Sequence, residues 1–156
     1  MRSLKVEQKT EDILNEINDL LVASNLVPVQ LESDKLYFFC HKDKAGKIIG
    51  VIGVELYGTS SLLRSLAVSF ERRNEGIGHS LLKEALAFAK SIASYDVYLI
   101  TETIADTMQD YGFCDVAREK MPAAMLKSPY LNGICPCSAR IMYINILKDK
   151  EEKLYD

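Results

Sequence analysis

The sequence is poor in cysteine, contains no long apolar run and carries no excess of basic residues. Its four cysteines, Cys40, Cys114, Cys135 and Cys137, are too few and too scattered for the disulfide framework of a secreted protein. No segment approaches the length of a membrane span, and the first twelve residues lack the apolar stretch of a signal peptide. These absences predict reduced thiols, a cytoplasmic location and no membrane partner.

Charge and composition exclude two further classes of protein. The 19 basic and 22 acidic residues give a formal net charge of -3, and no basic cluster is interleaved with aromatic residues, so nucleic acid is a poor candidate partner. With 48% apolar and 26% charged residues in 156, the chain is neither disordered nor fibrous and is long enough to bury a core. We therefore expect one domain over residues 1–147 and a charged tail over residues 148–156.

Strand and helix patterns alternate along the chain, which favours a single domain of the α+β class. Helical spacing of apolar residues predicts a helix that begins at Thr10 and ends before Pro28, and further helices over residues 77–94 and 105–111. Strands are predicted over residues 4–7, 36–41, 47–56, 62–68, 96–101, 113–118 and 140–147. A turn at residues 43–46 joins two of them into a hairpin, and residues 62–68 form a central strand. Residues 121–139, with three prolines, are expected to be irregular.

Two glycines, Gly76 and Gly78, stand where the helix over residues 77–94 begins. Each glycine inside a helix costs about 1 kcal/mol relative to alanine, so a reason for the pair is needed. A strand, a glycine turn and a helix N-terminus together present unpaired N–H groups and a positive dipole end, which bind anions such as phosphate. The pattern lacks the lysine of a Walker loop and the third glycine of a dinucleotide fingerprint. Alternatively, the glycines only let the helix pack closely onto the sheet.

The stretch Arg73-Asn74-Glu75-Gly76-Ile77-Gly78, which follows LLRSLAVSFER, resembles the pyrophosphate loop of the GCN5-related N-acetyltransferases. The order of elements is similar from Val6 to Ile146. This resemblance implies a mixed, mostly antiparallel sheet with helices on both faces, in which the fourth and fifth strands splay apart, and it implies acetyl-CoA as the cofactor. The implied cofactor-binding residues are Leu66, Ala67, Val68, Arg73, Asn74, Glu75, Gly76, Ile77, Gly78 and His79.

Three further stretches, GVELYGTSSLLRSLAV, YLITETIADTMQDYGF and NGICPCSARIMY, are similar to the arsenic-resistance N-acetyltransferases. That branch is close to the amino-acid acetyltransferases of the N-acetylglutamate synthase type. The resemblance implies an enzyme that transfers an acetyl group from acetyl-CoA to the amine of a small acceptor bearing a carboxylate, either an amino acid or an organoarsenical analogue. The sequence leaves open whether the protein forms a homodimer.

Acetyl transfer requires a polarised thioester carbonyl, a base for the amine and a proton for the departing thiolate. A backbone amide exposed by a bulge at Leu66 is expected to polarise the carbonyl. The glutamate that many family members carry on this strand is replaced by Arg64, which leaves Glu55 as the nearest candidate base, acting directly or through water. Alternatively, Glu55 is a solvated carboxylate at a strand end. Met108 stands where the family often has an acidic tyrosine, and Tyr111 is out of register, so water is expected to protonate the thiolate.

Acceptor recognition is assigned to Glu55, Arg64, Thr101, Thr103 and Cys135. The planar guanidinium of Arg64 suits the carboxylate of an acceptor, but it could instead pair with Glu55 and only hold the sheet together. The hydroxyls of Thr101 and Thr103 are placed to bond the acceptor or the cofactor's amides, although threonines at a strand end are usually just strand formers. In the similar branch the first cysteine recurs, so Cys135 has a structural or a substrate-side role.

The pair Cys135 and Cys137 does not predict a metal site. Two sulfurs with one residue between them fall short of the four ligands of a zinc site, and neither His41 nor His79 stands at ligand spacing to them. Two rival functions remain. One is an acyl-CoA binding or sensing module without turnover, suggested by the missing glutamate and tyrosine, and the other is a thiol-based binder of arsenicals or metals.

Overall fold

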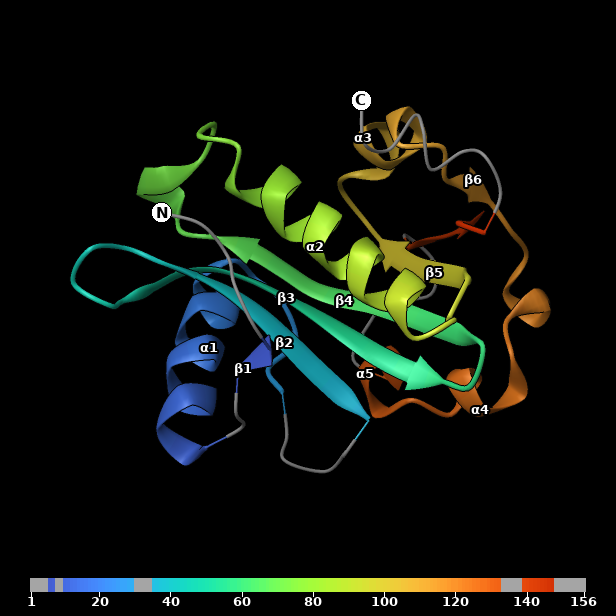
Figure 1. The fold of residues 1–156 in the computed structure, drawn as a ribbon, viewed down its shortest axis with the longest axis horizontal. Helices are drawn as coiled ribbons and strands as arrows, with labels where there is room; N and C mark the ends of the chain where they lie inside the picture. The colour runs from blue at the N-terminus through green and yellow to red at the C-terminus, as the bar shows by residue number, and fades with distance from the viewer. Residues whose placement is uncertain (1–5, 8–9, 30–34, 133–138, 148–156) are drawn as a thin grey trace. The chain divides into compact units, whose positions relative to one another are not determined.

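The computed structural model describes residues 6–7, 10–29, 35–132 and 139–147 (Figure 1). The chain divides into two compact units. The first consists of Met1–Glu55 with Arg64–Ala87, and the second consists of Leu56–Leu63 with Phe88–Asp156.

The described elements follow the predicted alternation of strands and helices. In chain order they are β1 (Val6–Glu7), α1 (Glu11–Ala23), β2 (Leu36–Lys42), β3 (Ile48–Tyr57), β4 (Ser60–Val68), η1 (Phe70–Arg72), α2 (Ile77–Ser91), β5 (Asp96–Thr101), α3 (Ala105–Asp110), β6 (Cys114–Asp115), η2 (Arg118–Lys120), α4 (Ala123–Leu126), α5 (Pro129–Asn132) and β7 (Arg140–Asn145). The strands are hydrogen-bonded in the order β1-β2-β3-β4-β5-β7-β6. The pair β4 and β5 is parallel, whereas β1·β2, β2·β3, β5·β7 and β6·β7 are antiparallel. The mixed, mostly antiparallel sheet is therefore confirmed.

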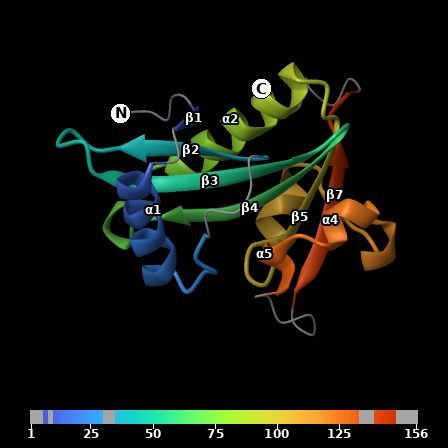
Figure 2. The same cartoon turned by 90° about the horizontal axis from the view of Figure 1, so that it is seen from below.

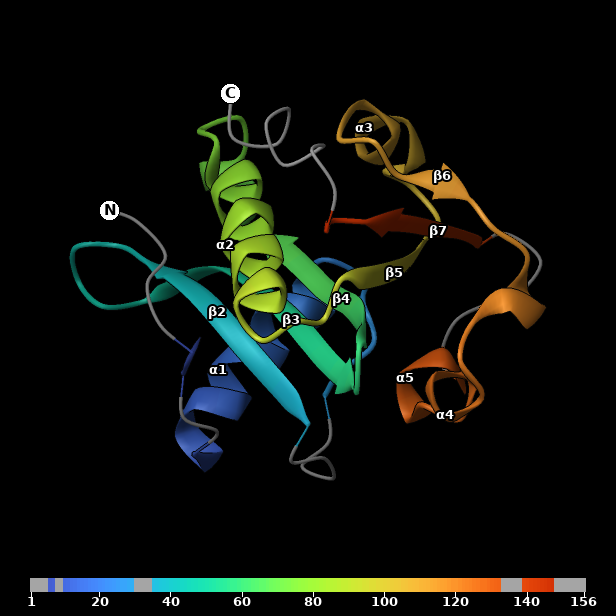
Figure 3. The same cartoon turned by 45° about the vertical axis from the view of Figure 1, so that its right-hand side comes forward.

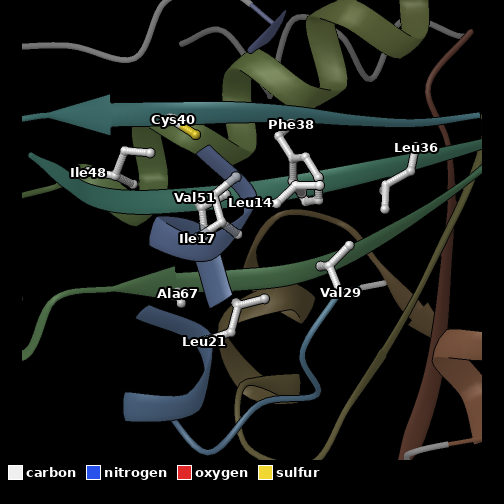
Figure 4. Packing of buried hydrophobic residues seen from close by; sticks show 10 residues of the cluster. All are labelled: Leu14, Ile17, Leu21, Val29, Leu36, Phe38, Cys40, Ile48, Val51 and Ala67. Atoms are coloured by element: carbon white, nitrogen blue, oxygen red, sulfur yellow. The ribbon is translucent and has the colours of Figure 1, made fainter. Parts of the chain in front are cut away.

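In the first unit, helices cover both faces of the strands, as expected. Figure 2 shows α1 on one side of β2, β3 and β4 and α2 on the other. Helix α1 begins where the sequence predicts, because the Thr10 hydroxyl accepts the N–H of Ile13 at 3.2 Å as an N-cap. The core between α1 and the strands is drawn in Figure 4 and consists of Leu14, Ile17, Leu21, Val29, Leu36, Phe38, Cys40, Ile48, Val51 and Ala67.

Close packing of α2 onto the sheet depends on Gly50 in β3. A Cβ at this position would lie 2.8 Å from Cγ2 of Ile77 and 3.1 Å from Cδ1 of Leu81, so the first turns of α2 approach the strand closely. The start of the helix is thereby fixed against the sheet.

Replacing Gly50 with alanine is expected to lower the free energy of unfolding by about 1–3 kcal/mol, because the added methyl overpacks the contact with Ile77. Urea denaturation measures the change. The matched control is Gly78→Ala, whose Cβ would meet only Cγ2 of Val68 at 3.8 Å. Equal stability of Gly50→Ala and the parent protein would show that α2 does not depend on this contact.

The second unit contains the first half of β4, Ser60–Leu63, together with β5, β7 and β6 (Figure 3). The parallel pairing of β4 with β5 runs from Ser60 opposite Asp96 to Leu63 opposite Leu99. Asp96 fixes the beginning of β5, because its Oδ1 accepts hydrogen bonds from the Tyr143 hydroxyl at 2.5 Å and from Nδ2 of Asn145 at 2.9 Å.

Two expectations for the second half of the chain were wrong. The strand expected over residues 113–118 is limited to β6, because the charged and exposed residues that follow turn into η2. The expected irregular segment contains α4 and α5. Pro122 is the N-cap of α4 and Pro129 is the first residue of α5, and proline is tolerated at these positions because no backbone N–H is needed there.

Element boundaries elsewhere agree with the sequence to within a few residues. Strand β5 matches the prediction, and α2 ends at Ser91 rather than at residue 94. Helix α3 ends before Gly112, whose φ of +102° is the left-handed conformation that a glycine C-cap adopts. The predicted charged tail over residues 148–156 lies outside the described residues.

Candidate active site

The turn between β4 and α2 presents backbone N–H groups at a helix N-terminus. Asn74 and Gly76 adopt left-handed conformations, with φ of +67° and +83°. The bond from the Ser80 N–H to the Gly76 carbonyl, 3.0 Å long, opens α2. The N–H groups of Ile77 and Gly78 therefore precede the intrahelical ladder and point toward the start of the helix. Together with the positive end of the helix dipole, these N–H groups are suited to binding an anion.

The two glycines of this turn do not serve close packing within the protein. No heavy atom of the described residues lies within 4 Å of a Cβ built on Gly76, and a Cβ on Gly78 would only touch Val68 at an ordinary 3.8 Å. The close approach of α2 to the sheet depends on Gly50 instead. The backbone conformation requires glycine at position 76, whereas the space beside Gly78 is open. The open space leaves room for a ligand to approach the backbone, as the prediction of a cofactor site at this turn requires.

Side-chain and backbone hydrogen bonds connect this turn to β3 and β4. Nε of Arg73 donates to the Val68 carbonyl at 3.1 Å, and Nε of Arg72 donates to both carboxylate oxygens of Glu75 at 3.1 Å. The Ser69 N–H donates to the Ile49 carbonyl at 2.8 Å, which ties the exit of β4 to β3. The predicted cofactor loop is thus preorganised. A preorganised loop loses less conformational entropy when it binds.

The end of β4 contains the irregularity that the chemistry requires. Ser65 has a φ of +60°, which is rare for a residue other than glycine, so the backbone of β4 departs from the extended conformation at this residue. The predicted cofactor-binding residues Leu66, Ala67 and Val68 follow directly, with Ala67 buried and the other two half-buried. The irregular backbone at Ser65 lies one residue before Leu66, and the bulge expected at Leu66 stays a prediction.

Glu55 and Arg64 form a buried ion pair on neighbouring strands. Nη1 of Arg64 lies 2.5 Å from Oε2 of Glu55, and the two side chains are only 2% and 4% exposed, respectively. Nε of Arg64 also donates to the Ser65 hydroxyl at 3.0 Å, beside the irregular backbone. The solvated strand-end carboxylate considered for Glu55 is therefore wrong. The pairing of Arg64 with Glu55, the structural alternative, is the arrangement observed.

The other residues considered for acceptor binding and those considered for the general acid lie in the second unit. Some of them stabilise the local backbone or are buried. Oγ1 of Thr101 accepts the N–H groups of Thr103 and Ile104, at 3.1 and 3.0 Å, so this hydroxyl shapes the turn that leads into α3. Thr103 is exposed. Met108 is buried, and burial raises the pKa of the half-buried Tyr111, which makes that phenol a poorer acid.

The structure describes only two of the four cysteines, Cys40 and Cys114. Cys135 and Cys137 lie outside the described residues, so the structure gives no account of the thiol-based rival. Among the residues that are described, no group of three or more potential metal ligands occurs.

Sequence reasoning overlooked two residues close to the turn in the first unit. The sequence pattern indicates no role for His41, which is 5% exposed. Its Nδ1 has no hydrogen-bond partner among the described residues, and burial lowers its pKa. Phe70, in η1, is 80% exposed. Nothing in the sequence marks His41, since it continues an apolar strand, but an aromatic residue next to a glycine loop was a usable indication.

Comparisons with known proteins agree with this geometry. The family model described as "Acetyltransferase (GNAT) domain" matches residues 33–115. No curated protein matches the chain. None of the helices within the described part of the chain is long and apolar enough to cross a membrane.

Solved structures of acetyltransferases share the fold. A GNAT-family acetyltransferase from Staphylococcus aureus superposes with a TM-score of 0.68 at 18% identity, over 91% of this chain and 98% of the other. N-acetylglutamate synthase from Neisseria gonorrhoeae, solved with coenzyme A and L-arginine, gives 0.72 at 15% identity over 95% of this chain, which spans only 34% of that protein. The ribosomal-protein-S18-alanine N-acetyltransferase from Escherichia coli gives 0.68 at 14% identity, over 91% and 93%.

The family model covers more than half of the chain and includes β4, the glycine turn and α2. Its match agrees with the topology of the sheet and with the glycine turn at the N-terminus of α2. The chain belongs to the GNAT acetyltransferase family and is an acetyl-CoA-dependent acetyltransferase.

Proposed function

We propose that residues 1–147 form an N-acetyltransferase domain that acetylates the amine of a small acceptor bearing a carboxylate, either an amino acid or an organoarsenical analogue. The observation that carries this proposal is the buried cation of Arg64, next to the irregular backbone of Ser65. A guanidinium largely removed from water binds carboxylates more strongly than an exposed one does. The proposal places the chain in the arsenic-resistance branch, close to the N-acetylglutamate synthases.

In this proposal, backbone N–H groups make most of the contacts to acetyl-CoA. The N–H groups of residues 74–79 donate to the diphosphate of acetyl-CoA, and the charges of Arg73 and the helix N-terminus favour it. Bound acetyl-CoA supplies an acetyl group activated as a thioester. The N–H of Leu66, next to the irregularity at Ser65, donates to the carbonyl oxygen as negative charge develops on it.

The ion pair supplies the polar groups for the acceptor. In the proposal, the Arg64 guanidinium, whose Nη1 is paired with Glu55, also contacts the carboxylate of the acceptor. Glu55 orients the fork and accepts the proton of the acceptor amine through water. No side chain is assigned as the general acid, because a thiolate is a good leaving group.

A thiol-release assay with acetyl-CoA and matched acceptors tests the acceptor class. Each amino acid, such as glutamate, is compared with its carboxamide, so that the amine is kept while the carboxylate charge is removed. We expect kcat/KM to be about 10-fold or more higher for the carboxylate form, in line with one charge-assisted contact of roughly 1.5–3 kcal/mol. Organoarsenical amines form a second set of acceptors.

Two results would overturn this acceptor class. The first is equal turnover of an amino acid and its carboxamide together with better turnover of peptides that begin with alanine. The second is tight acetyl-CoA binding without thiol release from any acceptor in the panel, which would indicate a sensing module.

A further inference from the structure

Phe70 stands out among the apolar side chains of the first unit. It is 80% exposed, more than the other exposed large apolar residues of the described chain, Val22, Ile92 and Leu147, at 59%, 41% and 54%. A single exposed apolar residue needs no explanation by itself. Its position does, because Phe70 lies in the short connection between β4 and the N–H groups that open α2.

The ring is held in place together with a positive charge. Cζ of Arg73 lies over the Phe70 ring, 5.4 Å from its centroid, which is within the range of a cation–π interaction. Nε of Arg73 is tied to the Val68 carbonyl at 3.1 Å. The backbone is fixed as well, since the Arg72 N–H donates to the Ser69 carbonyl at 2.9 Å. An exposed aromatic face and a guanidinium are therefore presented together, next to the anion-binding turn.

We propose that the Phe70 ring stacks on the adenine base of coenzyme A and that Arg73 contacts the 3′-phosphate of the same nucleotide. This proposal rests on the proposed binding of the diphosphate at the turn. The adenosine end of coenzyme A joins directly to that diphosphate, and it carries one flat aromatic base and one further phosphate. A ring and a guanidinium side by side match these two groups, because bases stack on aromatic side chains and arginine pairs with phosphate.

Calorimetric titration with three ligands tests the proposal: coenzyme A, 3′-dephospho-coenzyme A and 4′-phosphopantetheine, which lacks the nucleotide. We expect Phe70→Ala to raise the Kd of the first two by about 10-fold and to leave that of 4′-phosphopantetheine unchanged, because stacking on one base has about this effect. Phe70→Trp should retain the affinity. Arg73→Gln should raise the Kd of coenzyme A but change that of the dephospho form less.

The control is Val22→Ala, which removes an exposed apolar side chain from α1, away from the turn. An unchanged Kd of coenzyme A in Phe70→Ala would overturn the stacking, and so would an equal loss of affinity for 4′-phosphopantetheine. If the parent protein binds no coenzyme A at all, the proposed diphosphate site fails and the stacking fails with it.

Discussion

Replacing Gly78 with aspartate is expected to raise the Kd of acetyl-CoA by on the order of 100-fold, which corresponds to about 2.7 kcal/mol. The new carboxylate would occupy the open space beside the backbone and would repel the diphosphate from the N–H groups of α2. The fold should not suffer, because the new Cβ would only touch Val68 at 3.8 Å. An acidic residue in the first turn also stabilises a helix, by about 0.3–1 kcal/mol. Calorimetry with acetyl-CoA and urea denaturation measure the two effects.

The isosteric variant Gly78→Asn separates charge from size at this position. It adds the same number of heavy atoms without the negative charge, so its affinity should lie between those of the parent and of Gly78→Asp. If Gly78→Asp binds acetyl-CoA as tightly as the parent while remaining folded, the diphosphate does not contact the start of α2. A loss of stability in Gly78→Asp would mean that the position is packed, in disagreement with the geometry.

Breaking the buried ion pair from one side should be the most destabilising change proposed for this protein. Arg64→Met leaves Glu55 buried without its cation, and Glu55→Leu leaves Arg64 without its anion. Each variant is expected to lose about 3–5 kcal/mol of unfolding free energy, because a lone charge stays buried. The double variant removes both charges and should recover to within about 1 kcal/mol of the parent, since apolar side chains of similar volume replace a buried pair well.

The double variant also tests the role of the pair in acceptor recognition. If Arg64 binds the acceptor, Glu55→Leu/Arg64→Met keeps the affinity for acetyl-CoA but no longer prefers an amino acid over its carboxamide. Unchanged acceptor preference in a stable double variant would reduce the pair to a structural role. Single variants with almost parental stability would contradict the burial of the two charges.

Local patterns in the sequence were enough to predict most of the elements. The hairpin of β2 and β3 follows from a short polar turn between two apolar runs, and α1 follows from Thr10 and the helical spacing after it. The three prolines of residues 121–139 predict an irregular segment, and the short helices α4 and α5 are therefore not expected there. Proline is favoured at the first helical position, as in α5, and is tolerated at the N-cap, as in α4. Whether a helix forms in this segment therefore depends on where each proline stands relative to the first helical residue.

The candidate site was predictable only where it depends on the backbone. The glycine turn is contiguous in the sequence, so its pattern and the helix after it indicate an anion site directly. The pair of Glu55 and Arg64 depends on how β3 and β4 lie beside each other, and the sequence offered it only as an alternative. The exposure of Phe70 depends on η1, a short 3-10 helix that the spacing of apolar residues does not predict. Contacts between strands and exposure at turns are set by tertiary structure.

A crystal structure of the protein with coenzyme A bound tests the central claim most directly. We predict that diphosphate oxygens lie about 2.7–3.2 Å from the backbone nitrogens of residues 76–78, at ordinary hydrogen-bond distance. A diphosphate held elsewhere, with these nitrogens bonded only to water, would contradict the assignment of the turn as the cofactor site.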